Sequence, residues 1–273
     1  MPADALALAL ASALVHAVWN LLLARSRDAE AATAVVLVAA ALTGIPIAAA
    51  WWGIDARVWP FLLASTALEA AYITLLGAAY ARAELSVVYP LARGLAPVLV
   101  LLATVAFTGA SASTGEVAGV LLVGGGVMLV RGWRRGDAKG TGFGVAIAAL
   151  IAAYTVIDKH GIRYASPGTY LALLTLGMAL GYSPVVLVRR GMSAVRAEVR
   201  VRTLLAGVGM CGGYALVLAA LRLAPAASVS AVRESSVLIA TALAAVFLRE
   251  RVTRWRLGGA ALVAGGVALL SVF

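Results

Sequence analysis

Long apolar stretches separated by short charged loops make up almost the whole chain. Each stretch approaches the roughly 20 residues that a helix needs to cross the hydrocarbon core of a bilayer. Lipid offers no hydrogen bonds to the backbone, so helices are the expected spanning form, and strand-period alternation is absent. Ten transmembrane helices are predicted, at residues 3–24, 29–52, 58–80, 85–107, 115–131, 141–159, 168–188, 203–221, 226–248 and 255–272.

The composition supports a membrane protein. Of the 273 residues, 63% are hydrophobic and 12% are charged, and the mean hydropathy is +1.00. A soluble fold of this size needs more polar side chains to cover its surface. Soluble enzymes, disordered chains and secreted disulfide scaffolds are therefore excluded, and the single cysteine, Cys211, allows no internal disulfide.

The basic residues gather in alternate loops. Of the 22 Lys and Arg residues, 16 lie in the loops after predicted helices one, three, five, seven and nine, 4 lie in the other loops, and 2 lie within helices. Cytoplasmic loops carry the positive excess, so these loops are predicted to face the cytoplasm and both termini the opposite side of the cytoplasmic (inner) membrane. We attribute the charge to orientation and to contact with anionic lipid. A nucleic-acid partner is not expected, because the charges form no continuous patch.

The two halves of the sequence correspond at an offset of about 140 residues, with Asn20 matching Asp158 and Arg93 matching Arg233. Five helices per half is an odd number, so the second half is predicted to be inverted relative to the first. Inverted repeats of this kind build transporters, with the substrate site near the bilayer midplane. The predicted units are a first repeat at residues 1–131, a basic linker at 132–140 and a second repeat at 141–273.

Several short strings carry a family resemblance. They are His-Ala-Val-Trp-Asn at 16–20, Val-Tyr-Pro-Leu-Ala-Arg-Gly at 88–94, Val-Arg-Glu-Ser-Ser at 232–236 and Phe-Leu-Arg-Glu-Arg at 247–251. Together with ten helices in two repeats, they resemble the drug/metabolite transporter superfamily, specifically its EamA-type permeases. The last string departs from the family's usual Gly-Glu-Arg, because Arg249 replaces the glycine. The resemblance implies an all-α fold and transport of amino acids, drugs, choline-like compounds or other metabolites.

Four charged side chains fall in the interior of predicted helices, away from their ends: Glu69, Arg93, Arg233 and Glu234. A charge within a bilayer costs roughly 3 kcal/mol or more, so each requires a compensating role. One interpretation is that these residues line a substrate cavity, where a guanidinium can hold a carboxylate or phosphonate through two hydrogen bonds. The other is that they pair with one another to hold the helices together. The sequence leaves both open.

The candidate site residues share these predicted helices. The substrate-binding candidates are Arg93, Arg233, Tyr89, Tyr72, Trp19, His16, Asn20, Tyr154, Tyr214 and Ser230. The candidates for proton coupling, or for neutralising the arginines, are Glu69, Glu234 and Asp158. Glycines spaced by four favour close helix packing within one chain, so a monomer is expected, with a homodimer as the alternative.

The sequence contains no phosphate-binding Gly-rich loop, nucleophile elbow or metal-site motif, so we expect neither an enzyme nor a cofactor or bound metal. The leading hypothesis is a secondary active transporter of a small polar metabolite, with a carboxylate- or phosphonate-bearing, amino-acid-like substrate favoured by the two arginines. The alternatives are an exporter of cationic drugs or amines, a non-transporting membrane scaffold and a lipid-modifying membrane enzyme.

Overall fold

A computed structural model gives the fold of the chain and describes residues 1–23, 26–83, 85–109, 111–131, 138–239, 242 and 253–272. These residues form ten α-helices and one short 3₁₀ helix, with no β-strand among them. The elements are α1 (Ala3–Leu23), α2 (Ala29–Ala50), η1 (Ala56–Val58), α3 (Trp59–Arg82), α4 (Leu85–Thr108), α5 (Thr114–Arg131), α6 (Ala138–Gly161), α7 (Pro167–Glu198), α8 (Val201–Leu223), α9 (Ala226–Arg233) and α11 (Arg254–Val272).

Eight of the described helices are long and apolar enough to cross a membrane, and α5 is a shorter apolar helix. The prediction of an all-α membrane protein is therefore confirmed, whereas the inversion of the two halves stays a prediction. Local signals set several helix starts. The Asp28 side chain accepts a hydrogen bond from the amide of Ala31 at 3.1 Å, and Ser166 accepts one from Thr169 at 3.1 Å just before Pro167. Such side chains satisfy amides that have no partner within the helix.

The ninth predicted helix, 226–248, does not form as one continuous helix. Helix α9 ends at Arg233, a turn covers Glu234 and Ser235, and helical structure resumes at Ser236. Glu234 and Ser235 donate to carbonyls three residues back, at 3.0 Å each. Most of the remaining predicted segment, 240–248, lies outside the described residues apart from residue 242.

The seventh helix is longer than the predicted 168–188. Helix α7 continues past Arg189 and Arg190 to Glu198, with a break at Gly191, whose φ of 81° is readily accessible to glycine. Helix α6 begins at Ala138, so the final residues of the predicted linker are helical, while 132–137 lie outside the described residues.

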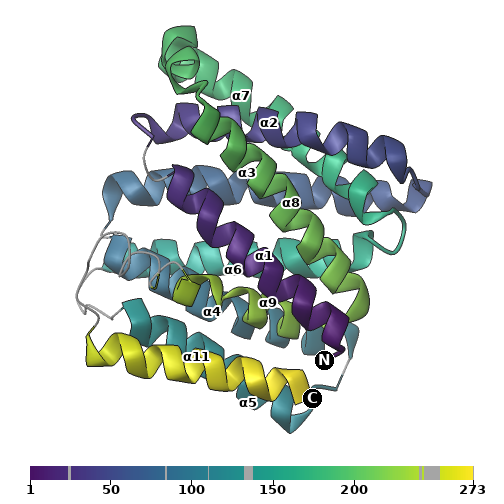
Figure 1. The fold of residues 1–273 in the computed structure, drawn as a ribbon, viewed down its shortest axis with the longest axis vertical. Helices are drawn as coiled ribbons and strands as arrows, with labels where there is room; N and C mark the ends of the chain where they lie inside the picture. The colour runs from purple at the N-terminus through teal and green to yellow at the C-terminus, as the bar shows by residue number, and fades with distance from the viewer. Residues whose placement is uncertain are drawn as a thin grey trace.

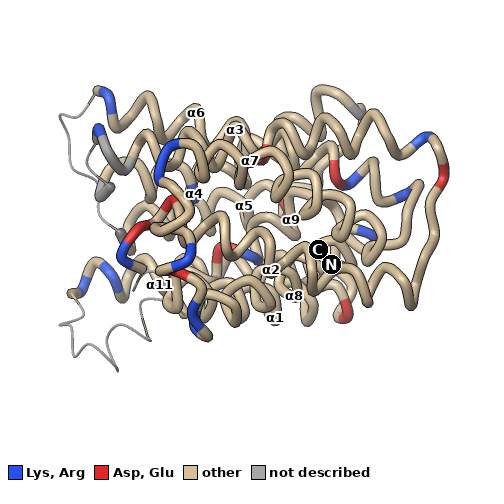
Figure 2. The backbone as a smooth tube through the Cα atoms, turned by 90° about the horizontal axis from the view of Figure 1, so that it is seen from above, with Lys and Arg blue, Asp and Glu red and all other residues tan. Residues whose placement is uncertain are grey.

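The helices form one bundle in which each half packs against the other (Figure 1). Helix α2 packs on α7 at one flank and α5 packs on α11 at the opposite flank, while α1 packs on α8 and α3 on α6 between them. Both termini lie at the same end of the bundle. We call this end the terminal end; it also holds the α2–α3 and α6–α7 loops. We call the opposite end, which holds the α1–α2 loop, the basic end. Most described Lys and Arg residues lie toward the basic end (Figure 2).

Backbones approach closely where α5 meets α11. A Cβ atom at Gly126 would lie 2.7 Å from the carbonyl oxygen of Gly259, and one at Gly259 would lie 2.6 Å from that of Gly126. About two turns further along α11, a Cβ atom at Gly266 would lie 2.7 Å from the carbonyl oxygen of Gly119. Small residues allow helices to pack this closely in lipid. The glycines of α5 and α11 therefore pack these two helices against each other within one chain.

A larger side chain at this contact should destabilise the protein. We expect Gly126→Leu to lower the free energy of unfolding by about 1–3 kcal/mol or more, as overpacking does in a rigid core, with a lower midpoint of thermal unfolding in detergent. Gly125→Leu is the matched control, because a Cβ atom at Gly125 meets nothing within 4 Å. Equal unfolding temperatures for the two variants would contradict the assigned contact.

Candidate functional site

A cavity of about 560 Å³ lies in the middle of the bundle. Its lining extends from Arg27 and Ala29, which are exposed in and after the α1–α2 loop, to Glu69 and Tyr154, which are buried. The cavity therefore opens toward the basic end. Helices α1, α2, α3, α4, α6, α7, α8 and α9 all contribute residues to its wall.

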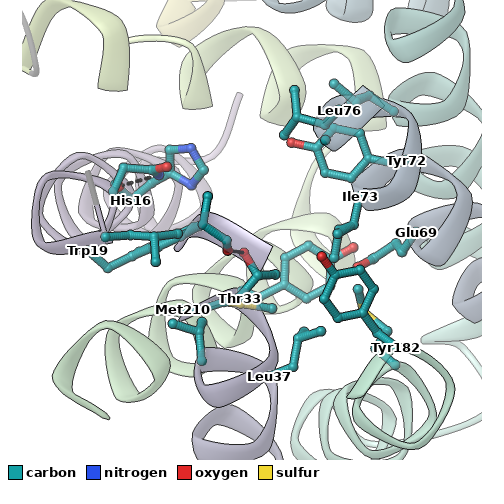
Figure 3. Close-up of a pocket in the computed structure, with 18 of the residues that line it drawn as sticks. His16, Trp19, Thr33, Leu37, Glu69, Tyr72, Ile73, Leu76, Tyr182 and Met210 are labelled. Atoms are coloured by element: carbon teal, nitrogen blue, oxygen red, sulfur yellow. Dashed lines mark hydrogen bonds between the residues drawn. The ribbon is translucent and has the colours of Figure 1, made fainter. Parts of the chain in front are cut away.

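Most of the residues singled out from the sequence come together in this cavity. Its wall includes His16, Trp19, Asn20, Glu69, Tyr72, Tyr89, Arg93, Tyr154, Tyr214 and Arg233. Figure 3 shows His16 and Trp19 of α1 on one side and Glu69 and Tyr72 of α3 on the other. Three predicted residues are not part of the lining: Asp158, Glu234 and Ser230, which are all buried.

Two of the four intrahelical charges form an ion pair. The Nε atom of Arg93 on α4 lies 3.0 Å from Oε2 of Glu234, and both side chains are less than a tenth exposed. Nη2 of Arg93 also lies 3.5 Å from Nε2 of His16. The interpretation in which intrahelical charges compensate one another therefore holds for Arg93 and Glu234. This pair joins α4 of the first half to the turn after α9 in the second.

The second arginine has a different environment. Among the described residues, no carboxylate lies within 4 Å of the Arg233 guanidinium, and its buried Nε atom has no hydrogen-bond partner there. The guanidinium lies over the ring of Tyr214, 5.6 Å from its centroid. Arg233 also stands in the last turn of α9, where the helix carbonyls favour a positive charge. A ring and a helix end thus stabilise this cation, and its hydrogen-bonding capacity is left available to a ligand.

The acidic residues also differ from one another. Glu69 lines the cavity, and its buried Oε1 atom has no hydrogen-bond partner among the described residues. Asp158 is fully buried and accepts hydrogen bonds from the hydroxyl of Tyr170 at 2.7 Å and from that of Tyr214. A buried polar atom without a partner is costly, so Glu69 is the acid that a ligand or a proton would satisfy.

The remaining aromatic candidates shape the wall. The rings of His16 and Trp19 meet edge to face with centroids 5.1 Å apart, and those of Tyr72 and Tyr154 lie 6.1 Å apart at 55°. The side-chain amide of Asn20 donates to the carbonyl of His16 at 2.8 Å. These contacts hold rings from α1, α3 and α6 in fixed positions around the space.

Sequence reasoning missed several residues of the cavity and its mouth. Tyr182, Met178 and Met210 line the cavity, but in sequence they look like any apolar residue of a membrane helix. At the mouth, Glu30 pairs with Arg190 at 3.0 Å. Glu198, buried at the end of α7, accepts hydrogen bonds from two backbone amides of the α1–α2 loop, at 2.9 and 3.2 Å. The contact of Glu198 with loop amides so distant in the sequence has no local sequence signature.

Comparison with protein families gives a match for the second half of this bundle. Residues 138–272 match the EamA-like transporter family. The second half of the chain belongs to the EamA-like transporter family. The predicted resemblance is thereby confirmed, and the molecule is a membrane transporter of the drug/metabolite type. The family is one of transporters and not of enzymes.

Other comparisons of this EamA-like transporter bear on its fold. A solved structure described as "Crystal structure of protein" matches it with a TM-score of 0.80, over 100% of this chain and 98% of the other, at 18% identity. At that identity the match supports the shared fold alone. No curated protein matches the chain.

The ion pair of this EamA-like transporter can be tested by thermodynamics. We expect Arg93→Met and Glu234→Met each to lower the free energy of unfolding by about 3 kcal/mol, because either leaves one buried charge without its partner. The double variant should recover most of that loss. Arg233→Met is the matched control, with an expected loss below about 1 kcal/mol. Denaturation in graded SDS provides the measurement, and additive losses in the double variant would show that the pair does not couple α4 to the turn after α9.

Proposed function

We propose that the protein is a secondary active transporter that moves a small zwitterionic, amino-acid-like metabolite across the cytoplasmic membrane by alternating access. The observation that carries the proposal is the presence, in one cavity, of a guanidinium and a carboxylate that form no salt bridge within 4 Å among the described residues. A substrate with an anionic and a cationic group satisfies both at once. The family membership supports transport, and the cavity supports the chemistry of the cargo.

Arg233 is the proposed anchor for the anionic group. A guanidinium presents donors in a planar fork that matches a carboxylate or a phosphonate. Arg93 carries the same group but is occupied by Glu234 at 3.0 Å. Of the two arginines that the sequence offered for this role, the geometry favours Arg233.

Glu69 is the proposed partner of the cationic group, and the proposed site of proton exchange when the substrate is absent. The carboxylate lies in the cavity wall, whereas Glu234 and Asp158 lie outside the lining and already contact protein side chains. An unpaired carboxylate in an apolar bundle is stabilised by an ammonium group or by a proton. Competition between the two would couple cargo movement to a proton gradient.

The packing of the helices supports alternating access. Helix α1 packs on α8, and α3 packs on α6. Because α6 corresponds to α1 and α8 corresponds to α3 in the two halves, each contact between halves has its counterpart, as expected for inverted repeats. The cavity opens toward the basic end. With the basic loops in the cytoplasm, as the charge asymmetry predicts, this conformation is the inward-open one, and we propose both termini on the outer side. We propose a monomer that requires only its substrate and the lipid bilayer.

A second candidate function is export of a cationic drug or amine. Its support is the set of aromatic rings in the same cavity wall as Glu69, because Trp19, Tyr72 and Tyr154 can bind a cation through their faces. The two functions differ in the role of Arg233, which would repel a purely cationic cargo. Nothing in the described cavity favours a scaffold or a lipid-modifying enzyme over either transporter.

Binding to the purified protein separates the two candidates. We expect zwitterionic amino acids to raise the unfolding temperature, and their amine and carboxylate analogues to raise it less. Arg233→Gln should weaken amino-acid binding at least tenfold, because a bond to a charged group is worth about 1.5–3 kcal/mol, and Glu69→Gln should reduce the preference for an ammonium group. Titration calorimetry provides the affinities.

Glu30→Gln, at the mouth of the cavity, is the matched control and should keep the affinity within about twofold. Simple amines that bind as tightly as amino acids, with no effect of Arg233→Gln, would establish the cationic alternative. A stable protein that binds no member of the panel, and moves none into proteoliposomes under a proton gradient, would overturn the proposal.

A further inference from the structure

Reciprocal hydrogen bonds close the terminal end of the bundle. Lys159 of α6 donates to the carbonyls of Leu221 and Ala224 at the end of α8, the latter at 2.9 Å. Arg222 of α8 donates in return to the carbonyls of Ile162, at 2.9 and 3.1 Å, and Ala165, at 2.8 Å, just after α6. Lys159 thus supplies a cation to carbonyls at the end of α8, and Arg222 supplies one to carbonyls of the segment just after α6.

Two loops from different halves complete this closure. Residues Ile54 and Ala165 form an antiparallel bridge, and the amide of Ser166 donates to the carbonyl of Gly53 at 2.8 Å. The amide of Asp55 donates to the carbonyl of Tyr164 at 2.7 Å. Hydrogen bonds from Arg57 lower the pKa of Asp55 to about 2, so the two residues form a charge pair within this loop. By bonding to Ala165, Arg222 attaches α8 to both loops.

The closure reaches the cavity through Asp158. This carboxylate directly precedes Lys159 and binds the hydroxyls of Tyr170 on α7 and Tyr214 on α8. Tyr214 lines the cavity, and its ring lies against the guanidinium of Arg233. A continuous series of side chains therefore connects the proposed anion-binding group to the closed end.

We propose that Lys159 and Arg222 form the latch of a gate at the terminal end, and that Tyr214 and Asp158 connect this gate to the cargo. The inference rests on the proposed function, because alternating access requires this end to open. The latch bonds suit reversible opening, because their acceptors lie at the end of α8 and in the segment after α6, where water can replace the cations without unwinding a helical turn.

We assign Arg82 to the corresponding latch at the basic end. Arg82 ends α3 and stands 140 residues before Arg222, the offset that also relates Arg93 to Arg233. In this structure, where the basic end is open, the Arg82 side chain is exposed. In the opposite conformation it would bond to the final carbonyls of α1, as Arg222 bonds to those that follow α6.

Distances between spin labels test this assignment without requiring any substrate. In a Cys211→Ala background, labels at Trp52→Cys and Leu223→Cys report on the terminal end, and labels at Arg27→Cys and Ala83→Cys on the basic end. We expect Lys159→Met/Arg222→Gln to increase the population with a longer terminal-end distance about fivefold or more, and to shorten the basic-end distance. Arg82→Gln should shift both populations in the opposite direction.

Arg163→Gln is the matched control, because Arg163 is an exposed cation of the same end that makes none of these bonds, and it should leave both distributions unchanged. Unchanged distributions in the double variant would overturn the latch, as would equal shifts in the control. If the double variant does not give a monodisperse protein, Arg222→Gln alone must show the same direction of shift or the proposal fails. Shifted distances in a protein that binds no amino acid would preserve the gate and refute the proposed cargo.

Discussion

A guanidinium and a carboxylate inside an apolar bundle attract each other strongly, because little water is present to screen them. Arg93 and Glu234 form such a pair at 3.0 Å, and through it α4 of the first half is attached to the broken helix of the second. The chemistry of the cavity depends on this choice of partners. Because Arg93 is neutralised by Glu234, Arg233 and Glu69 remain as the two intrahelical charges of the wall with no salt-bridge partner among the described residues.

The sequence predicts the helices well because each one must satisfy two requirements, length and apolar character, that hydropathy measures directly. It also places the polar candidates at similar depths, and most of them meet in one cavity. It does not predict which charges pair. Arg93 could in principle meet Glu69 or Glu234, and the outcome depends on how α3, α4 and α9 are arranged side by side, which no local pattern records.

Two other features escape sequence reasoning for physical reasons. Apart from Arg233 and Glu234, the segment from Ala226 to Ile239 is apolar or hydroxylic, so hydropathy shows one helix where the backbone in fact turns at Glu234. The apolar part of the cavity is equally hidden. Met178 and Met210 face the interior, whereas Leu180 and Leu204 face outward, and all four are the same kind of residue in a membrane helix. Only the packed structure separates the side that faces the cavity from the side that faces lipid.

The contact between α5 and α11 has a mechanical consequence. Gly126 and Gly259 bring the two backbones together with no side chains between them, so neither helix can slide past the other by exchanging rotamers. This pair therefore moves as one rigid body and can serve as a stator. The rearrangements that carry cargo would then fall to the helices that line the cavity.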